Sequence, residues 1–589
     1  MAAAIGVNLI VGLLAWRMSR WDGPPIVASP SRRKRKRMQA DQRHASATET
    51  SLDPFTSLAL AFISGVAMLA LEVLSIRMVS LVVPSSFQAT VGVLASVILL
   101  LSVAALATPW VLRTWWSARA WLLGALVTSS IAASLAPWLL YRRTNQLIDV
   151  SHLAAMSGDH LATTAQFLLA VCGVALFTVG PALLAGGLVL PIVFAWSGDG
   201  RSSTTTSDNQ RGARFGYLLA ANGFGGIVGA ELTDLVILPT WGIYQGFAVI
   251  GVLYALGFAL LATPWRGRSI LRSAAACAVL AVPLISSRWK LSNLPYLSPR
   301  ATVPYDVFAT EFGRDGVLLV VESASRGRGI LLNNQYLLGS SGSFRDERRE
   351  VLLPMLLHPQ PQEVCCVGVA TGISAGAALD ASATSRLTAV EISSLVSDAA
   401  KRHFREFNRE LYEDPRTEVV VEDGRTYVAA SKDRFDVIVG DLYRPYGAGE
   451  GRLFSVEHFE AARRALRDGG LFCQWLPMYQ LTEAHFRMIT ASFLQAFPDA
   501  ELLRANDKSD YPMLALLGWK RGGFDAESVA KNCTALKEAA TISDEALFDP
   551  EFVGNMYLGR INAAEFAGVP HNTLGNAQIE ILAGRRRIT

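Results

Sequence analysis

Long apolar stretches dominate the first half of the chain, and short apolar runs between polar segments dominate the second. A helix that crosses about 30 Å of hydrocarbon needs roughly 20 apolar residues. The stretches that reach this length predict six membrane-spanning helices, at residues 57–83, 87–112, 120–141, 163–196, 216–238 and 243–263. The fourth is longer than one span and contains Gly180, Pro181, Gly186 and Gly187, so we expect it to be kinked or broken.

Two further apolar segments leave the number of spans open. Residues 273–287 are short for a span and predict an interfacial or re-entrant helix, or a further crossing. Residues 1–17 are apolar but also too short. We therefore expect an α-helical membrane domain of about six to eight spans at 57–290, preceded at 1–56 by an apolar segment and a basic linker.

The distribution of Lys and Arg predicts the orientation of these helices. The run at residues 32–37 and the arginines at 113, 119, 201, 211, 214, 266, 268 and 272 fall on one side if there are six crossings. Positively charged loops favour the cytoplasm, so that side is expected to be cytoplasmic and to carry the C-terminal half as well. If residues 273–287 cross, the C-terminal half faces outward instead.

In the second half, the spacing of apolar runs changes from that of spanning helices to that of strands. Residues 305–335 alternate around glycines and predict antiparallel hairpins. Short apolar runs at 363–369, 387–392, 418–421, 435–440 and 470–475 then alternate with helical segments, which predicts a parallel doubly wound sheet. We expect a β-hairpin module at 300–350, an α/β domain at 351–525 and a C-terminal extension at 526–589.

Composition limits the class of protein. Of the 589 residues, 51% are apolar and 18% are charged, which excludes disordered, collagen-like, small secreted and purely soluble proteins. Six cysteines give no disulfide framework, and the eight histidines show no metal-ligand spacing, so we expect no metal.

Polar and glycine positions follow four predicted strands in order. Gly368 and Gly372 open a helix after the first strand, and Glu391 ends the second. Asp423-Gly424 and Asp441 follow the third and fourth strands. Ligands of open α/β sheets bind at the carboxyl ends of the strands. A glycine turn followed about 20 residues later by a carboxylate is typical of nucleoside cofactor sites.

Ionisable residues within the predicted spans are few: Glu72, Arg77, Glu231 and Asp234. Glu231 and Asp234 lie three residues apart, on one helix face, after Gly225 and Gly229. They are either charges near the bilayer boundary beside packing glycines, or an acidic cavity for a cationic solute. Both interpretations stay open.

Residues 300–520 resemble the spermidine synthase (polyamine aminopropyltransferase) family, and the whole chain resembles its membrane-fused bacterial members. The matching stretches are FISGVAMLALEVLSIR at 62–77, residues 216–239, NNQYLLG at 333–339, LPMLLHPQP at 353–361, GVATGISAGAAL at 368–379, residues 390–392, 414–416 and 422–425, GDLYRP at 440–445 and GGLFCQWLPMY at 469–479. The resemblance implies a Rossmann-like, methyltransferase-type sheet behind a β-hairpin module.

The resemblance also implies roles for the residues at the strand ends. Glu391 would bind the ribose and Asp423-Gly424 the adenine of decarboxylated S-adenosylmethionine, with Gly368, Thr371 and Gly372 forming the glycine loop. Asp441 would be the general base that accepts a proton from an amine such as putrescine, and methylthioadenosine would be released. Tyr443, Tyr446 and Gln335 are candidates for the amine pocket.

Some family positions are occupied by other residues here. An aspartate of the family's glycine loop, which holds the cofactor's amine, is replaced by Thr371. The family's Tyr-His-Glu has no counterpart among Asp346, Arg348, Arg349 and Glu350, and the hairpin glutamine that follows Asp-Gly is missing from the register at 333–337. Intact S-adenosylmethionine is therefore the alternative cofactor.

Three functions follow from these patterns. The leading one is an integral membrane aminopropyltransferase, in a bacterial cell membrane, with a cytoplasmic catalytic domain. The second is an S-adenosylmethionine-dependent methyltransferase that acts on a small or membrane-associated acceptor. The third is an amine or lipid carrier, or a sensor, with a regulatory nucleoside-binding domain. The expected partners are a small amine and the lipid bilayer; a homodimer is left open, and nucleic acid is not expected.

Overall fold

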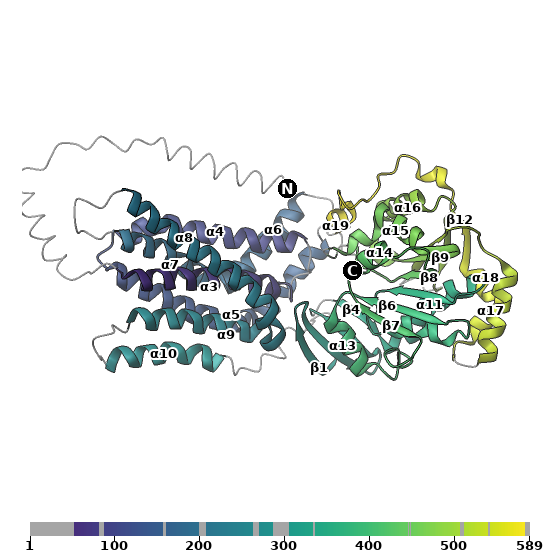
Figure 1. The fold of residues 1–589 in the computed structure, drawn as a ribbon, viewed down its shortest axis with the longest axis horizontal. Coiled ribbons are helices and arrows are strands. Elements are labelled where there is room, and N and C mark those ends of the chain that lie inside the picture. Colours follow the sequence, from purple (N-terminus) through teal and green to yellow (C-terminus); the bar gives the residue numbers. More distant parts are fainter. Residues whose placement is uncertain are drawn as a thin grey trace, which may run out of the picture.

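The computed structural model describes residues 52–81, 87–156, 161–198, 208–262, 270–286, 305–333, 336–445, 447, 449–506, 512–539 and 542–583. They form a helical domain followed by an α/β domain, which lie end to end (Figure 1). The basic run at 32–37 and the pocket candidates Gln335 and Tyr446 lie outside the described residues.

Within the described ranges, the helical domain consists of α3 (Pro54–Val79), α4 (Phe87–Val111), α5 (Ala118–Met156), α6 (Leu161–Thr178), α7 (Gly180–Gly198), α8 (Asp208–Leu232), the π-helix η1 (Thr233–Ile237), α9 (Leu238–Ala262) and α10 (Ile270–Ser286). In this part of the chain, five helical segments are long and apolar enough to cross a membrane: Pro54–Val79, Ala89–Val111, Ala118–Leu140, Gly180–Ser197 and the bent Ala213–Ala262. The over-long fourth stretch is divided between α6 and α7, as its glycines and proline predict.

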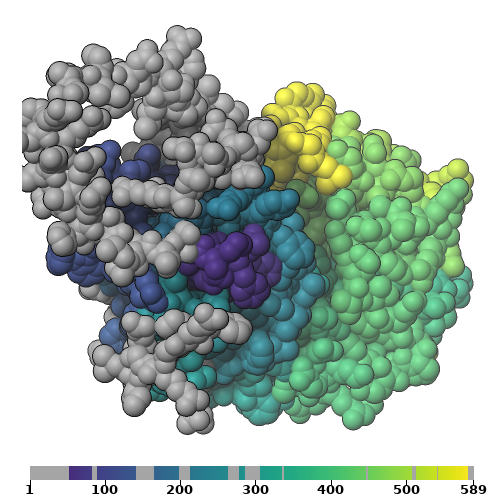
Figure 2. Space-filling view, turned by 60° about the vertical axis from the view of Figure 1, so that its left-hand side comes forward, coloured from purple at the N-terminus to yellow at the C-terminus, as the bar shows by residue number. Residues whose placement is uncertain are grey.

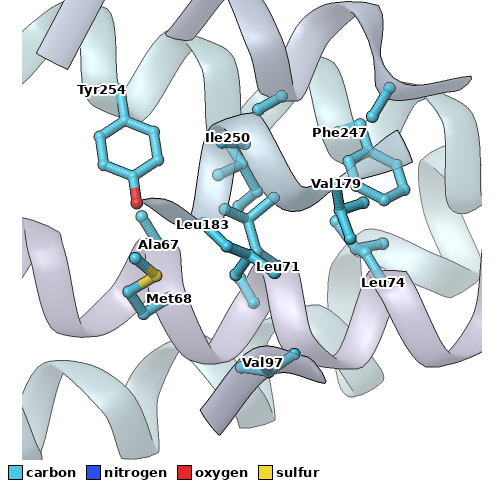
Figure 3. Packing of buried hydrophobic residues seen from close by; sticks show 14 of the residues in the cluster. Ala67, Met68, Leu71, Leu74, Val97, Val179, Leu183, Phe247, Ile250 and Tyr254 are labelled. Carbon is cyan, nitrogen blue, oxygen red and sulfur yellow. The ribbon is translucent and has the colours of Figure 1, made fainter. Parts of the chain in front are cut away.

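Glycines bring α3 and α8 into close contact. A Cβ on Gly225 would lie 2.3 Å from the Phe62 carbonyl oxygen, and one on Gly229 would lie 2.2 Å from that of Val66. Small residues at such positions let two backbones approach within an apolar bundle. Gly225 and Gly229 are therefore packing glycines, as one of the two interpretations of the sequence predicts. Larger side chains fill the centre, where Leu71 of α3 packs near Ile250 of α9 (Figure 3).

Helices α9 and α10 connect the bundle to the α/β domain. The first turns of α9 contact the small sheet, whereas its last turn accepts a hydrogen bond at Leu261 from Arg119, at the other end of the bundle. Helix α10 then packs along α9 and α5, with Pro283 beside Gly251 (Figure 1). The chain therefore runs back toward the α/β domain through α10.

A small antiparallel sheet lies between the two domains. Its strands follow the order β1 (Asp306–Gly313), β2 (Gly316–Ser323), β3 (Gly327–Leu332) and β4 (Tyr336–Ser340). Val317, Leu319 and Val321 of β2 belong to the same hydrophobic core as the helices. The alternate residues Leu318 and Val320 pack against α13. Both faces of β2 are therefore buried.

The large sheet has eight strands in the order β12-β10-β11-β9-β8-β5-β6-β7. Its strands are β5 (Glu363–Val367), β6 (Arg386–Glu391), β7 (Thr417–Val421), β8 (Phe435–Gly440), β9 (Leu466–Pro477), β10 (Glu501–Arg504), β11 (Met513–Trp519) and β12 (Tyr557–Arg560). Strands β5 to β9 pair in parallel, as the alternation of strands and helices predicts, and the remaining pairs are antiparallel.

The helices of this domain are α11 (Phe344–Leu357), α12 (Ile373–Ala377), α13 (Ser394–His403), α14 (Gly424–Ala430), α15 (Val456–Ala465), α16 (Glu483–Ala496), α17 (Ala526–Ala539), α18 (Pro550–Met556) and α19 (Gln578–Ala583). Part of the stretch predicted as a separate extension, 526–589, completes the α/β domain. Strand β12 pairs with β10, and Asn532 of α17 donates to the carbonyl oxygens of Leu356 and His358. These contacts join sequence-distant segments, which apolar spacing alone does not reveal.

The two domains are in direct contact. Figure 2 shows the helices of residues 208–262 lying against the α/β domain. Phe312 of β1 fits against Gly242 of α9, where the helix is kinked by a φ of 73°. Arg314, in the β1–β2 turn, donates to the Asp234 carboxylate from Nε and Nη2, at 3.0 and 2.7 Å.

Candidate functional site

A cleft of about 1270 Å³ lies at the carboxyl ends of the parallel strands. One side is formed by the ends of β5, β6 and β8, and the other by the small sheet and α11. Of the residues proposed from the sequence, those that line the cleft are Gly368, Glu391, Asp423, Gly424, Asp441, Tyr443 and Arg77. The fold therefore brings together residues that are up to 75 positions apart within the α/β domain, and adds one from the helical domain.

The turn after β5 approaches the cleft closely. Gly368 has φ 94°, and a Cβ there would lie 3.0 Å from the Asp441 Cβ, so a larger residue would be strained. Ala370 also has a positive φ, of 50°. Gly372 (φ 79°) and Thr371 do not line the cleft: Gly372 packs against Asn408, and Thr371 is buried.

Backbone N–H groups hold the Glu391 carboxylate at the end of β6. Its Oε2 accepts from the N–H groups of Val369 and Ala370, both at 3.1 Å. Its Oε1 accepts from the N–H of Ser393 at 3.0 Å. Burial raises the pKa of Glu391, and these hydrogen bonds oppose that shift. The carboxylate is thus fixed against the glycine turn.

Asp423 caps a helix. Its Oδ1 accepts from the N–H of Arg425 at 2.8 Å, and its Oδ2 lies 3.3 Å from the Arg425 Nη2. Gly424 fits closely against Val367, because a Cβ there would lie 2.4 Å from the Val367 Cγ1. The local role of Asp423-Gly424 is therefore to begin α14 at the cleft wall.

Asp441 shares a hydrogen bond with Glu350, a residue of α11. Burial raises the pKa of Asp441, while hydrogen bonds from the Leu442 N–H and from Glu350 lower it. Burial, with the adjacent charges of Asp441 and Glu347, raises the pKa of Glu350 well above its usual range. Two carboxyl groups in contact cannot both ionise readily. These shifts indicate that Glu350 keeps its proton and donates a hydrogen bond to the Asp441 carboxylate.

Glu347 lies one helical turn before Glu350 and contacts Thr371. The Thr371 hydroxyl donates to Glu347 Oε2 at 3.0 Å, and the Ser340 N–H donates to Oε1 at 2.7 Å. Burial raises the pKa of Glu347 to about 8, although both hydrogen bonds oppose the shift. The Glu347 carboxyl group therefore reaches the cleft next to Thr371, the residue that replaces the family's aspartate.

Tyr443 forms part of the cleft wall with its ring. Its hydroxyl donates to the Val367 carbonyl oxygen at 2.9 Å and is thereby directed into the sheet. Burial raises the pKa of the Tyr443 hydroxyl well above its usual range.

Of the four ionisable residues predicted in the spans, Asp234 and Arg77 lie close to each other. Asp234 lies 3.7 Å from the Arg77 guanidinium and also binds Arg314. Glu231 is exposed and Glu72 is half-buried in α3. Asp234 is thus an interdomain ion-pair residue, and its negative charge is balanced by arginines. Among the described residues, no group of three or more His, Cys, Asp or Glu side chains could hold a metal ion.

The amino-acid sequence of the α/β domain is similar to that of known proteins. Residues 348–506 match the family described as "Spermine/spermidine synthase domain". The chain is 31% identical over 198 residues to a polyamine aminopropyltransferase of Aeropyrum pernix, covering 33% of this chain and 63% of that protein. It is 31% identical over 168 residues to polyamine aminopropyltransferase 1 of Pseudomonas aeruginosa, covering 28% and 58%.

The α/β domain is therefore similar in sequence to spermidine synthases and polyamine aminopropyltransferases. The chain spans less than two thirds of the length of either relative. A solved spermidine synthase from Thermotoga maritima has a TM-score of 0.35 and 21% identity, covering 42% of this chain and 88% of that one.

In this domain, Glu347 and Glu350 are cleft residues that the sequence patterns did not predict. The resemblance to the family assigns no role to either residue. They lie three positions apart, which places them on one face of α11, toward the cleft. This spacing was the available signal. Arg348 and Arg349, between them, point away and pair with Asp380 and Asp544.

The pKa of Glu347 predicts how stability depends on pH. The folded protein keeps this proton up to about pH 8, whereas the unfolded chain releases it near 4.5, so the group lowers stability as pH rises between these values. Relative to the native protein, Glu347→Gln should therefore gain about 3 kcal/mol of unfolding free energy from pH 5 to pH 8.

Denaturant unfolding of the full chain in detergent, at both pH values, measures this difference. Glu538→Gln, an exposed change on α17, is the control and should follow the native protein. If Glu347→Gln gains nothing between pH 5 and pH 8, Glu347 does not have a raised pKa.

Proposed function

We propose that the protein is an integral membrane aminopropyltransferase that uses decarboxylated S-adenosylmethionine and an amine such as putrescine. The observation that carries the proposal is the group of carboxyl residues that converge in one cleft: Glu347, Glu350, Glu391 and Asp441. Such a group favours ligands with positive charge. The relatives named polyamine aminopropyltransferase support the same reaction.

The residues fit a nucleoside with a cationic tail. Glu391 is held by backbone N–H groups and retains lone pairs that would accept the two ribose hydroxyls. Asp423-Gly424, at the edge of the same cleft, would contact the adenine. We assign the amine pocket to the wall that contains Tyr443, together with Gln335 and Tyr446.

The position of Glu347 distinguishes decarboxylated from intact S-adenosylmethionine as the cofactor. It would take the place of the aspartate that Thr371 replaces, and contact the amine of the aminopropyl group. Intact S-adenosylmethionine carries a carboxylate on that tail, which Glu347 would repel once ionised. This argument favours the decarboxylated cofactor over the methyltransferase alternative.

Asp441 would act as the general base. An amine attacks only when neutral, and a carboxylate within hydrogen-bond reach removes its proton as the new bond forms. When bound, the cofactor supplies a carbon activated by its sulfonium, so that the carbon–nitrogen bond forms as the carbon–sulfur bond breaks. Glu350 would hold Asp441 in place and limit its charge while the cleft is empty.

Membrane integration is part of the proposal, and it rests on the five long apolar helical segments. We propose that the α/β domain faces the cytoplasm. A nucleoside cofactor of this type is made in the cytoplasm, which requires the domain to face it. However, Arg113, Arg119 and Arg214 lie at the end of the bundle away from the α/β domain, and positively charged ends favour the cytoplasm.

The cofactor is tested by calorimetric titration of the full chain with decarboxylated S-adenosylmethionine, intact S-adenosylmethionine and methylthioadenosine. We expect the decarboxylated form to bind at least 10-fold more tightly than the intact form, a difference of about 1.4 kcal/mol. In Glu347→Gln this preference should be reduced. Tighter binding of the intact form would favour methyl transfer, and binding of none would remove the nucleoside proposal.

Asp441→Asn should lower turnover by about 100-fold or more, because general bases contribute on this scale. Methylthioadenosine affinity should stay within about 2-fold, because the nucleoside contacts are unchanged. Release of methylthioadenosine with an amine acceptor measures turnover. Asp436→Asn is the matched control: it lies at the opposite end of β8, where it accepts from the N–H groups of Gln362 and Glu363. Full turnover by Asp441→Asn would exclude it as the base.

Cysteine labelling decides the orientation. In a Cys277→Ser background, Ser382→Cys places a thiol on the exposed surface of the α/β domain, and Ser117→Cys places one at the far end of the bundle. The proposed function requires that a membrane-impermeant maleimide label Ser117→Cys, but not Ser382→Cys, in intact cells. The reverse pattern would place the α/β domain outside the cell, in conflict with an intracellular cofactor.

A further inference from the structure

The β1–β2 turn contacts the helical domain on one side and the nucleoside cleft on the other. Arg314 points to the helices, where it makes two hydrogen bonds to Asp234. The next residue, Asp315, accepts a hydrogen bond from the Ser393 hydroxyl and lines the cleft. Consecutive residues therefore connect the two domains through one tight turn.

On the helical side, the turn is held mainly by packing. The Asp234–Arg314 ion pair contributes little to stability, because the Arg314 side chain is 60% exposed and water screens the two charges. Phe312 contributes more, because its ring fills the space left by the missing side chain of Gly242, at the kink of α9. The buried face of β2 continues this contact into the core of the helices.

On the cleft side, the turn reaches the nucleoside carboxylate through two hydrogen bonds. Ser393 caps α13 by accepting from the Val396 N–H at 3.2 Å, and its own N–H donates to Glu391. Glu391 in turn accepts from the glycine turn. Asp315, Ser393, Glu391 and the turn after β5 thus form one hydrogen-bonded network.

Arg77 shows that the helical domain reaches the cleft itself. It lies near the end of α3, beside Asp234, and lines the same cleft as Glu391 and Asp315. The cleft wall therefore continues from the strand ends into the helical domain.

We propose that contacts made by the helical domain position the residues of the nucleoside site. The contacts of Asp234 and Gly242 with the β1–β2 turn hold Asp315, which positions Ser393 and Glu391. Asp234, Phe312, Arg314 and Asp315 are positioning residues. The inference rests on the proposed nucleoside function for its purpose, but the mechanical connection exists in the empty protein and can be measured there.

Three variants interrupt the connection at different points. Gly242→Ala places a methyl group 2.6 Å from the Phe312 ring and displaces the turn from α9. Asp234→Asn weakens the ion pair with little change in size. Asp315→Asn acts at the cleft end and lies outside the helices, so it remains informative if Gly242→Ala fails to fold. Arg521→Gln is the control, because its ion pair with Asp468 is also exposed and lies elsewhere on the surface.

The first measurement is hydrogen exchange of the full chain in detergent, without ligand, over residues 366–372 and 390–397. We expect Gly242→Ala and Asp315→Asn to exchange about 5- to 20-fold faster at these residues, which corresponds to a coupling at the low end of the usual range. Asp234→Asn should give a smaller rise, because it removes only an exposed ion pair. Exchange in β10 and β11 should stay unchanged. Methylthioadenosine affinity, by calorimetry, should fall by a similar factor, whereas Arg521→Gln should match the native protein in both measurements.

The outcomes separate this inference from the proposed function. Native exchange at both segments in all three variants would overturn it, and so would an equal rise across the whole α/β domain, which would mean a general loss of stability. If exchange rises only at these segments but the native protein binds no nucleoside, the coupling stands and the proposed function fails.

Discussion

The site depends on one electrostatic constraint: several buried and half-buried carboxyl groups line the same cleft. Left alone, they would repel each other or bind protons. The fold meets this constraint in two ways. Backbone N–H groups donate hydrogen bonds to Glu391, and a hydrogen bond joins Glu350 to Asp441. A nearby positive charge would favour the ionised form of each of these carboxyl groups.

The second organising feature is the small sheet between the domains. Val317 and its alternate neighbours pack on the helices, while Leu318 and Val320 pack on α13. The helical and α/β domains are therefore not independent bodies joined by a linker. Packed side chains and the β1–β2 turn connect one face of this sheet to the other, so contacts of the helical domain and of the cleft meet within a few residues.

Much of this organisation could be predicted from the sequence. Apolar length and period gave the helices, the break in the fourth stretch and the parallel strands, and residue order placed Glu391 and Asp441 at strand ends. The sequence could not show that Glu347 reaches the cleft beside Thr371, because α11 precedes the sheet and its docking depends on tertiary contacts. For the same reason, the sequence could not show that the main partner of Asp234 is Arg314, which lies 80 residues away.

Strand β2 has a consequence for any attempt to study the α/β domain alone. Its first six residues, Gly-Val-Leu-Leu-Val-Val, are apolar without alternation, as expected for a strand covered on both faces. A fragment that starts at residue 305 would keep α13 on one face but would expose Val317, Leu319 and Val321 to water on the other. Large exposed apolar surfaces promote association with other proteins and aggregation. The excised domain would thus carry an artificial sticky face, and self-association of such a fragment would report the missing helices rather than a native assembly.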